Sequence, residues 1–192
     1  HVNQATLWGQ ATWKYDRFDY FFAANATSTS FFREGLMKNG IFPNNSVGVS
    51  NIYTFNNPGF KGGMTYKMNG RNYFFANASF MGRAPLIDNA YISIRTRDLV
   101  APDLQSEKIY GGEVGYLFRA PRVKAKAIAY YTQFTGITDT RSYFDGDYYT
   151  FVNFTLSNIE KRHDGIELSA EANLGQGFSA TAVASVGQYV YT

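Results

Sequence analysis

Apolar and polar residues alternate along most of this chain, with the two-residue period that is typical of β-strands. No stretch shows the three-to-four-residue apolar spacing, capped at both ends, that predicts an amphipathic helix. The sequence therefore predicts an all-β fold of about eight consecutive antiparallel strands. They cover about residues 4–13, 18–27, 60–68, 72–80, 110–118, 123–132, 149–174 and 178–187.

Short turns and long connections alternate between these strands. Tight turns are predicted near residues 15, 69, 121 and 176, and Asn69-Gly70 is a strong hairpin signal. Long connections are predicted over about 31–57, 83–106 and 135–148. This order places all tight turns at one end of the strands. Outer-membrane β-barrels show this arrangement, with short periplasmic turns and longer extracellular loops.

Aromatic residues gather in two bands, about ten residues apart along the strands, and small apolar residues fill the space between them. Aromatic girdles mark the two membrane interfaces of transmembrane barrels. The banding therefore favours a membrane-spanning barrel over a soluble core. The first band holds Phe18, Tyr20, Tyr66, Tyr73, Phe74, Phe118 and Phe178, and the second holds Phe31, Phe60, Phe80, Tyr110, Tyr130, Tyr131 and Tyr189.

Composition excludes several classes of site in this 192-residue chain. There is no Cys, and the two His residues, His1 and His163, are far apart in sequence, so neither a metal nor a cofactor is expected. The net charge is +3 with both signs scattered, which does not indicate a nucleic-acid partner. No apolar run is long enough for a transmembrane helix, but a barrel strand needs only about 9–11 residues.

The second face of the predicted strands is polar and charged. Glu113, Lys124, Lys126, Glu167 and Glu171 are expected on it, facing a wet lumen or a polar plug. A soluble β-sandwich or lipocalin-like barrel also alternates, and it stays open as an alternative.

One segment breaks the pattern. Glu160, Arg162 and Asp164 fall on the face expected to meet lipid. Either only Gly165 to Leu174 spans the membrane, with Arg162 at the outer interface, or a β-bulge near Gly165 changes the register.

Three stretches, taken in order, carry a family resemblance. The first is LQSEKIYGGEVGYLFR, with Tyr110 to Gly115 at its core, and the second is VKAKAIAYYTQFTGIT. The third, from Phe151 to Leu174, places Asn153 about a dozen residues before Gly165-Ile166-Glu167. Together they resemble the strands of TonB-dependent outer-membrane receptors. The stretch from Arg71 to Asp98 is also similar to the receptors of Bacteroidetes.

The resemblance implies a barrel of about 22 strands with a plugged lumen, of which residues 1–192 form one part of a single barrel domain. The plug domain, the TonB-contacting segment and the ends of the barrel would then lie outside these residues, and the chain would be an interior piece. The expected function is active import of a scarce nutrient across the outer membrane of a Gram-negative cell. Expected partners are outer-membrane lipid and lipopolysaccharide, the plug domain, TonB and a surface lipoprotein.

The long connections hold the candidate substrate-binding residues, because Arg pairs with carboxylates or phosphates and Tyr stacks on sugars. The competing interpretation is that these residues hold loops together or bind lipopolysaccharide. The candidates are Arg95, Arg97, Asp98, Arg141, Tyr143 and Tyr148.

Two other functions are compatible with parts of this pattern. A complete eight-stranded barrel with a structural or adhesive role needs residues 4–13 to pair with residues 178–191. An enzyme would have to use the loop-side residues, but they lack any motif context for a catalytic triad, so no enzymatic activity is expected. These residues are Asp139, Ser142, Asp145, Asp147 and His163.

Overall fold

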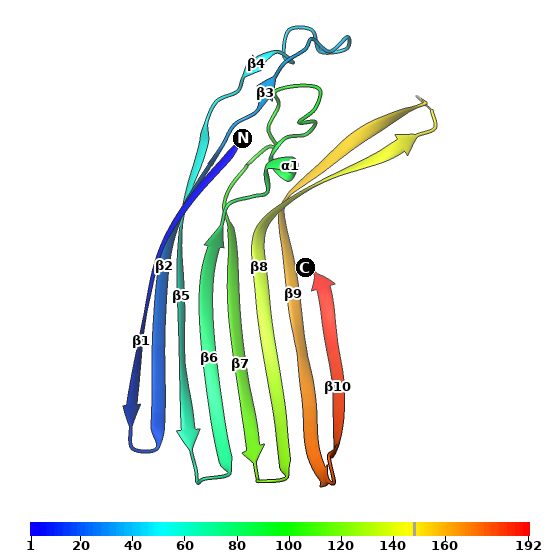
Figure 1. Ribbon diagram of the computed structural model, residues 1–192. Helices are drawn as coiled ribbons and strands as arrows, with labels where there is room; N and C mark the ends of the chain where they lie inside the picture. Colours follow the sequence, from blue (N-terminus) through cyan, green and yellow to red (C-terminus); the bar gives the residue numbers. More distant parts are fainter. Residues whose placement is uncertain (148) are drawn as a thin grey trace.

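The computed structural model describes residues 1–147 and 149–192. Eight strands form one sheet in the order β1-β2-β5-β6-β7-β8-β9-β10 (Figure 1). Their bounds are β1 Val2–Tyr15, β2 Phe18–Phe31, β5 Tyr53–Lys67, β6 Asn72–Arg83, β7 Glu107–Arg119, β8 Val123–Asp145, β9 Thr150–Gly175 and β10 Phe178–Tyr191. Three short elements lie in the connections: β3 Glu34–Gly35, β4 Gly48–Val49 and helix α1 Ile87–Ala90.

None of the described residues forms a helix that is long and apolar enough to cross a membrane.

Every strand of the large sheet pairs antiparallel with its neighbour in the chain, as the sequence predicts. All four tight turns lie at the lower end in Figure 1, and the long connections lie at the upper end. β1 and β10 are the two edges of the sheet, and within the described part of the chain they do not pair with each other. The closed eight-stranded barrel, which needs that pairing, is therefore not the fold observed.

The register gives the sheet one apolar and one polar face, because cross-strand partners point to the same side. On the apolar face Ala76 pairs with Val114, and Val114 pairs with Ala129. The next row, on the opposite face, joins Glu113 to Asn77 and Tyr130. Period-two alternation along each strand produces this division. The charged residues Arg162 and Asp164 of β9 interrupt it on the apolar face.

The apolar face carries aromatic ladders near both ends of the strands. Toward the long connections, Phe60 stacks on Phe22 and Phe80 at ring-centroid distances of 6.4 and 6.5 Å, and Phe80 contacts Tyr110 at 5.2 Å. Near the tight turns, Phe18 stacks on Tyr66 and Phe74 packs on Tyr116, both at 5.0 Å. Four members of the predicted bands do not belong there, because the register turns them to the polar face: Phe31, Tyr73, Tyr130 and Tyr189.

Nothing among the described residues packs against the apolar face. Its side chains stay open, with Val114 58% and Leu168 50% exposed. A soluble sandwich would cover such a face with a second sheet, so the sandwich alternative is wrong. A wall that meets lipid on this side explains both the exposure and the aromatic ladders.

Residues 84–106, called the roof below, fold back over the upper end of the polar face. Tyr91 and Ala90 of the roof are fully buried, and they pack with Phe31 of β2. The Tyr91 hydroxyl shares a 2.8 Å hydrogen bond with Ser50 Oγ. This small apolar core attaches the roof to the sheet.

A buried arginine links the roof to the preceding long connection. Arg33 Nε donates to the Ile94 carbonyl at 2.6 Å, and Arg33 Nη2 donates to the Ser46 carbonyl at 2.8 Å. The backbone N–H of Arg33 donates to Ser50 Oγ at 2.9 Å. The two long connections therefore form one packed layer.

The prediction that residues 135–148 form a loop is wrong for most of that range. β8 continues to Asp145 and pairs with β9 from Thr150 onward, as a hairpin that leans away from the wall (Figure 1). We call residues 138–145 and 150–157 the extension. Its base carries register shifts between Phe134 and Asp139, together with left-handed φ values of 72° at Gly136 and 58° at Asn158. These irregularities bend the strands without ending them.

Pairing runs unbroken through Gly165, which joins Tyr130 on one side and Gly187 on the other. The predicted β-bulge near Gly165 is therefore wrong. Arg162 lies on the apolar face in the row of Gln133 and Tyr110, next to the upper aromatic ladder. Its charge sits where the membrane interface is expected, and Arg162 Nε lies 3.0 Å from Asp164 Oδ1.

Candidate functional site: the polar face and its roof

The five charged residues predicted for the inner side all lie on the polar face. Glu113 pairs with Tyr130, Lys124 with Glu171 and Lys126 with Ser169, while Glu167 pairs with Ile128. Lys124 Nζ lies 3.4 Å from Glu171 Oε1, and both side chains are more than half exposed. The polar face therefore carries charge of both signs. That this side borders a lumen or plug stays a prediction.

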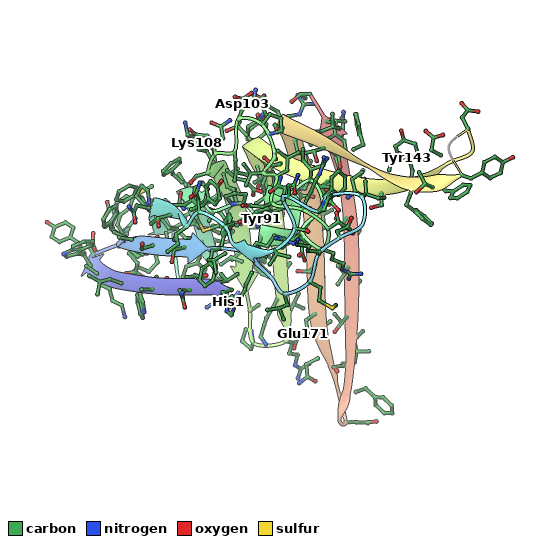
Figure 2. The ribbon with its side chains drawn as sticks, turned by 90° about the horizontal axis from the view of Figure 1, so that it is seen from above. His1, Tyr91, Asp103, Lys108, Tyr143 and Glu171 are labelled. Carbon is green, nitrogen blue, oxygen red and sulfur yellow. The ribbon has the colours of Figure 1, made fainter. Side chains whose placement is uncertain are left out.

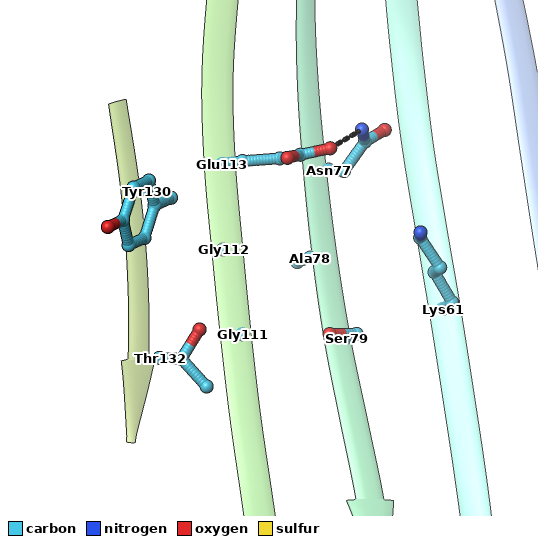
Figure 3. A pocket seen from close by; sticks show the side chains of 9 residues that line it. All are labelled: Lys61, Asn77, Ala78, Ser79, Gly111, Gly112, Glu113, Tyr130 and Thr132. Carbon is cyan, nitrogen blue, oxygen red and sulfur yellow. Dashed lines mark hydrogen bonds between the residues drawn. The ribbon is translucent and has the colours of Figure 1, made fainter. Parts of the chain in front are cut away.

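A shallow hollow of about 170 Å³ lies in the middle of the polar face. Figure 3 shows Asn77 and Glu113 reaching toward each other, with Lys61 and Thr132 on flanking strands. Asn77 Nδ2 donates to Glu113 Oε1 at 2.6 Å. This hydrogen bond orients the carboxylate, which keeps further acceptor capacity for a group that approaches the wall.

Several large side chains of the polar face lie flat across glycines. A Cβ on Gly165 would stand 2.7 Å from the Tyr130 hydroxyl, and one on Gly115 would stand 2.3 Å from the Phe75 ring. The Tyr130 hydroxyl reaches the Tyr189 hydroxyl at 3.0 Å. Because glycine has no side chain, the neighbouring rings can lie flat against the sheet at these positions instead of projecting from it.

His163, the only histidine of the chain besides His1, is part of an aromatic cluster. Its ring lies between Phe134 at 5.0 Å and Tyr189 at 4.8 Å. Ser142 Oγ donates to Asn153 Oδ1 at 2.5 Å, and Ser142 lies ten residues along β8 from Thr132, the partner of His163. The structure does not bring these two candidate catalytic side chains together.

A cavity of about 380 Å³ lies between the polar face and the start of the roof. Its floor carries the hydroxyls and amides of Asn25, Thr27, Thr29 and Asn57, and Leu86 belongs to its rim. A second hollow of about 410 Å³ adjoins this cavity, because Asn25 lines both of them. The indole of Trp8 also lines the second hollow.

Asn57 is the most constrained polar residue of this cavity. It is 5% exposed, and its Nδ2 has no hydrogen-bond partner among the described residues. Sequence reasoning missed this residue because it assigned residues 31–57 to a loop, whereas β5 begins at Tyr53. The alternation of Tyr53, Phe55 and Asn57 with smaller or more exposed residues was the available signal.

The roof holds three of the predicted substrate-binding residues, and two of them attach it to its surroundings. The Arg97 guanidinium lies over the Phe42 ring, 4.5 Å from its centroid. The Asp98 backbone exchanges hydrogen bonds with Asn45 at 2.7 and 3.0 Å. Arg95 is exposed and, within the described residues, contacts no partner. Only Arg95 is thus free to meet a ligand.

The extension holds two more of the predicted residues, and Tyr148 lies outside the described residues. Arg141 Nε donates to Asp139 Oδ2 at 2.8 Å, and this hydrogen bond raises the pKa of the exposed guanidinium further. Tyr143 is 52% exposed. Figure 2 shows Tyr143 far out on the extension, away from Tyr91 in the roof. The structure therefore divides the predicted loop residues into two separate groups.

Burial raises the pKa of the Tyr91 phenol above its usual value of 10.0, and the hydrogen bond to Ser50 offsets part of this rise. The negative charge of nearby Asp98 adds to it. The neutral phenol therefore belongs to the packed roof.

Comparison with known proteins bears on the fold and the family. The family model "TonB dependent receptor-like, beta-barrel" matches residues 1–192. No curated protein matches this chain in sequence.

Among solved structures, the copper transporter OprC is similar, with a TM-score of 0.72 and 15% sequence identity. The similarity covers 97% of this chain and 30% of that transporter. The FrpB iron transporter of Neisseria meningitidis (F3-3 variant) is similar with a TM-score of 0.68 and 14% identity, over 99% of this chain and 26% of that one. This chain thus spans less than a third of either transporter. At these identities the solved structures support the fold alone, whereas the family match covers the whole chain. The chain belongs to the TonB-dependent receptor-like β-barrel family.

Proposed function

We propose that this chain is part of the barrel wall of an outer-membrane, TonB-dependent active transporter. The whole protein would bind a scarce nutrient on its extracellular side and import it through a plugged barrel. One observation carries the proposal: the sheet is apolar with aromatic ladders on one face and charged on the other. Such a wall suits lipid outside and water or a polar plug inside.

All 192 residues would belong to one barrel domain of this transporter. The plug domain and TonB would be engaged through other parts of the protein. The hollow beside Glu113 supports contact with a polar plug, because its oriented carboxylate has unused acceptor capacity. The proposed location of this transporter is the Gram-negative outer membrane, where proteins of its family are found.

Outer-membrane lipid and lipopolysaccharide are the proposed partners of the apolar face. Arg162 and Lys108 support this, since both lie on that face at the level of the upper aromatic ladder or above it. A cation at the interface costs about 0–1 kcal/mol, far less than at the membrane midplane. Lipid phosphates would offset this cost.

A surface lipoprotein is the proposed partner of the extension. Phe154, Leu156 and Tyr143 are each about half exposed on this hairpin. An isolated two-stranded hairpin is marginally stable in water, so a partner that covers these side chains would stabilise it.

We propose that substrate contacts those loop residues whose polar side-chain groups are exposed. Arg95 is the strongest of them because it is exposed and has no described partner. Arg141 and Tyr143 could contact substrate only at the distal extension. Arg97 and Asp98 already hold the roof, which supports the loop-holding interpretation for these two residues.

The proposal is tested with the full-length gene in its own cell. Parent and deletion strains are fed a defined mixture of metal chelates, vitamins, glycans and peptides, and mass spectrometry follows what each strain depletes. The proposal expects at least one compound whose depletion needs both the gene and TonB. An Arg95→Ala variant should slow that depletion, while Arg71→Ala, at a tight turn, should not. Identical depletion by the parent and deletion strains would contradict the proposal.

A further inference from the structure

The cavity beneath the roof differs in chemistry from the rest of the polar face. Elsewhere that face carries carboxylates and ammonium groups, such as Glu113 and Lys126. The cavity floor instead carries neutral hydrogen-bonding groups, two threonine hydroxyls and two asparagine amides. Arg83 is the one charged residue of the lining, and its Nε donates to Glu107 Oε2 at 2.9 Å, so its charge is balanced. The rest of the lining is mainly apolar and includes Phe31, so a ligand that fits is neutral and offers both hydrogen-bonding groups and apolar faces.

Asn57 provides the observation that points to a ligand. Its amide nitrogen is a buried donor without a hydrogen-bond partner, at the floor of the cavity. Leaving such a group unsatisfied costs about 1–3 kcal/mol. Its Oδ1 lies close to Gly82, since a Cβ on Gly82 would stand 2.8 Å from it. A ligand oxygen that reaches Nδ2 would remove this cost.

Trp8 adds an apolar platform in the adjoining hollow, whose lining also includes the charged Lys61. It pairs with Asn25, so its indole projects to the polar face, and it is 71% exposed. On the polar face the Trp8 ring would not contact lipid. The second tryptophan, Trp13, differs because it pairs with Tyr20 on the apolar face. Flat indoles suit the C–H faces of ligand rings, and their edges leave hydroxyl groups free to hydrogen-bond.

We infer that the cavity beneath the roof, together with the adjoining Trp8 hollow, binds a neutral polyhydroxylated ligand, an oligosaccharide. The combined space suits a short chain of sugar rings, since small-molecule sites measure about 300–1,000 Å³. One ring stacks on Trp8, and the next lies over Asn25 and Asn57 with the threonine hydroxyls at its side. Leu86, which lines the same cavity, offers an apolar contact to that ring. This inference rests on the proposed import function and names the class of its substrate.

The test uses the full-length protein in lipid nanodiscs and an array of neutral oligosaccharides, acidic oligosaccharides and short peptides. The expected result is binding to at least one neutral oligosaccharide. For that compound, titration calorimetry should show that Asn57→Ala and Trp8→Ala each weaken binding about tenfold, the effect of losing roughly one good hydrogen bond or stacking contact.

Matched controls come from the opposite face of the same strands. Asn56→Ala and Trp13→Ala remove the same side chains beside or near the tested ones but on the apolar side. They should leave affinity unchanged. Heat-modifiable electrophoretic mobility confirms that all four variants are folded barrels.

Three outcomes overturn the inference: no neutral oligosaccharide binds, only acidic oligosaccharides or peptides bind, or the bound compound is insensitive to both cavity variants. If TonB-dependent depletion of another nutrient persists in these cases, the proposed function stands and only the oligosaccharide site fails. If an oligosaccharide binds but no compound is depleted in a TonB-dependent way, the site stands and the import function fails.

Discussion

The two faces of this sheet are built from the same strands, yet they tolerate different residues. On the apolar face, Val114 stands among Ala76, Ala129 and other small or branched residues, without a polar group in its row. One residue away, Glu113 hydrogen-bonds to Asn77 on the opposite face. The difference shows that the solvent on each side, and not strand propensity, selects the side chains of this wall.

The faces also use glycine differently. On the polar face, Gly165 lies beneath the Tyr130 hydroxyl and against the Val186 carbonyl. On the apolar face, Gly112 has its nearest neighbour 3.8 Å from the position of a Cβ. On the polar face, glycine leaves room for aromatic rings that lie flat against the sheet. On the apolar face, glycine leaves an open space that lipid chains can occupy.

Charge placement should give the largest difference between the faces. Val114→Arg puts a cation on the apolar face near the middle of the membrane, where it costs about 2–4 kcal/mol. Glu113→Arg puts the same side chain one residue away on the polar face, where the main loss is the hydrogen bond to Asn77, about 0.5–1.5 kcal/mol. Denaturant unfolding of the full-length protein in liposomes measures both values. Equal costs would mean that the apolar face does not meet lipid.

Added methyl groups should separate the faces by a smaller amount. Gly165→Ala brings a Cβ to 2.6 Å from the Val186 carbonyl oxygen and 2.9 Å from Gly187 Cα, so the backbone must shift. We expect a loss of about 1–3 kcal/mol in unfolding free energy. Gly112→Ala meets only ordinary contact distances and should be neutral or slightly stabilising, because alanine restricts the unfolded chain. The same liposome experiment compares them, and a larger loss at Gly112 would contradict this account.

Much of the wall could be predicted because a strand's period of two is visible in the sequence. The strand order, the tight turns and the five charged positions of the polar face followed from that period. The predicted strand 149–174 contains the β9 half of the extension, but the β8 half is not predicted, because Gly136 interrupts the alternation at its base. In the sequence alone the turn signal at Asp145-Gly146 is typical of a loop, whereas in the structure β8 continues up to Asp145.

The cavity beneath the roof could not be predicted from the same pattern. Asn57 lies beside Gly82 of β6, and residues 84–87, distant from it in sequence, line the same cavity. No local signal records that contact, since the roof is held by Tyr91 and Phe31, residues sixty positions apart in the chain. Alternation predicts which face a side chain takes, but tertiary packing decides whether that face is covered.

The roof should respond to the loss of one hydrogen bond by a still smaller amount. Tyr91→Phe removes the bond to Ser50 and leaves the packing in place, so it should lower the local stability of residues 84–106 by about 0.5–1.5 kcal/mol. Hydrogen exchange of roof amides in the full-length protein measures this. Tyr143→Phe, on the exposed extension, is the control and should leave the exchange of the roof unchanged.

The same tyrosine makes the roof sensitive to alkaline pH. Its folded pKa is raised above 10.0, so its contribution is fully present below pH 10 and is lost as the pH rises through the folded pKa. Roof amides should therefore lose protection above about pH 10. In Tyr91→Phe this pH-dependent loss should shrink. An unchanged alkaline transition in the variant would show that another group controls the roof.

The smallest effect should come from the exposed ion pair on the polar face. Lys124 and Glu171 lie 3.4 Å apart with side chains 65% and 51% exposed, so water screens their attraction. Lys124→Gln should change the unfolding free energy by less than about 0.5 kcal/mol, because exposed pairs contribute little. If the polar face instead packs against a plug in the full-length protein, water no longer screens the pair and the same substitution costs more. Comparing Lys124→Gln in the full-length protein and in a variant without its plug therefore reports directly on what the polar face touches. A larger loss in the presence of the plug would place that plug against β8 and β9, and equal small losses would leave these strands facing water.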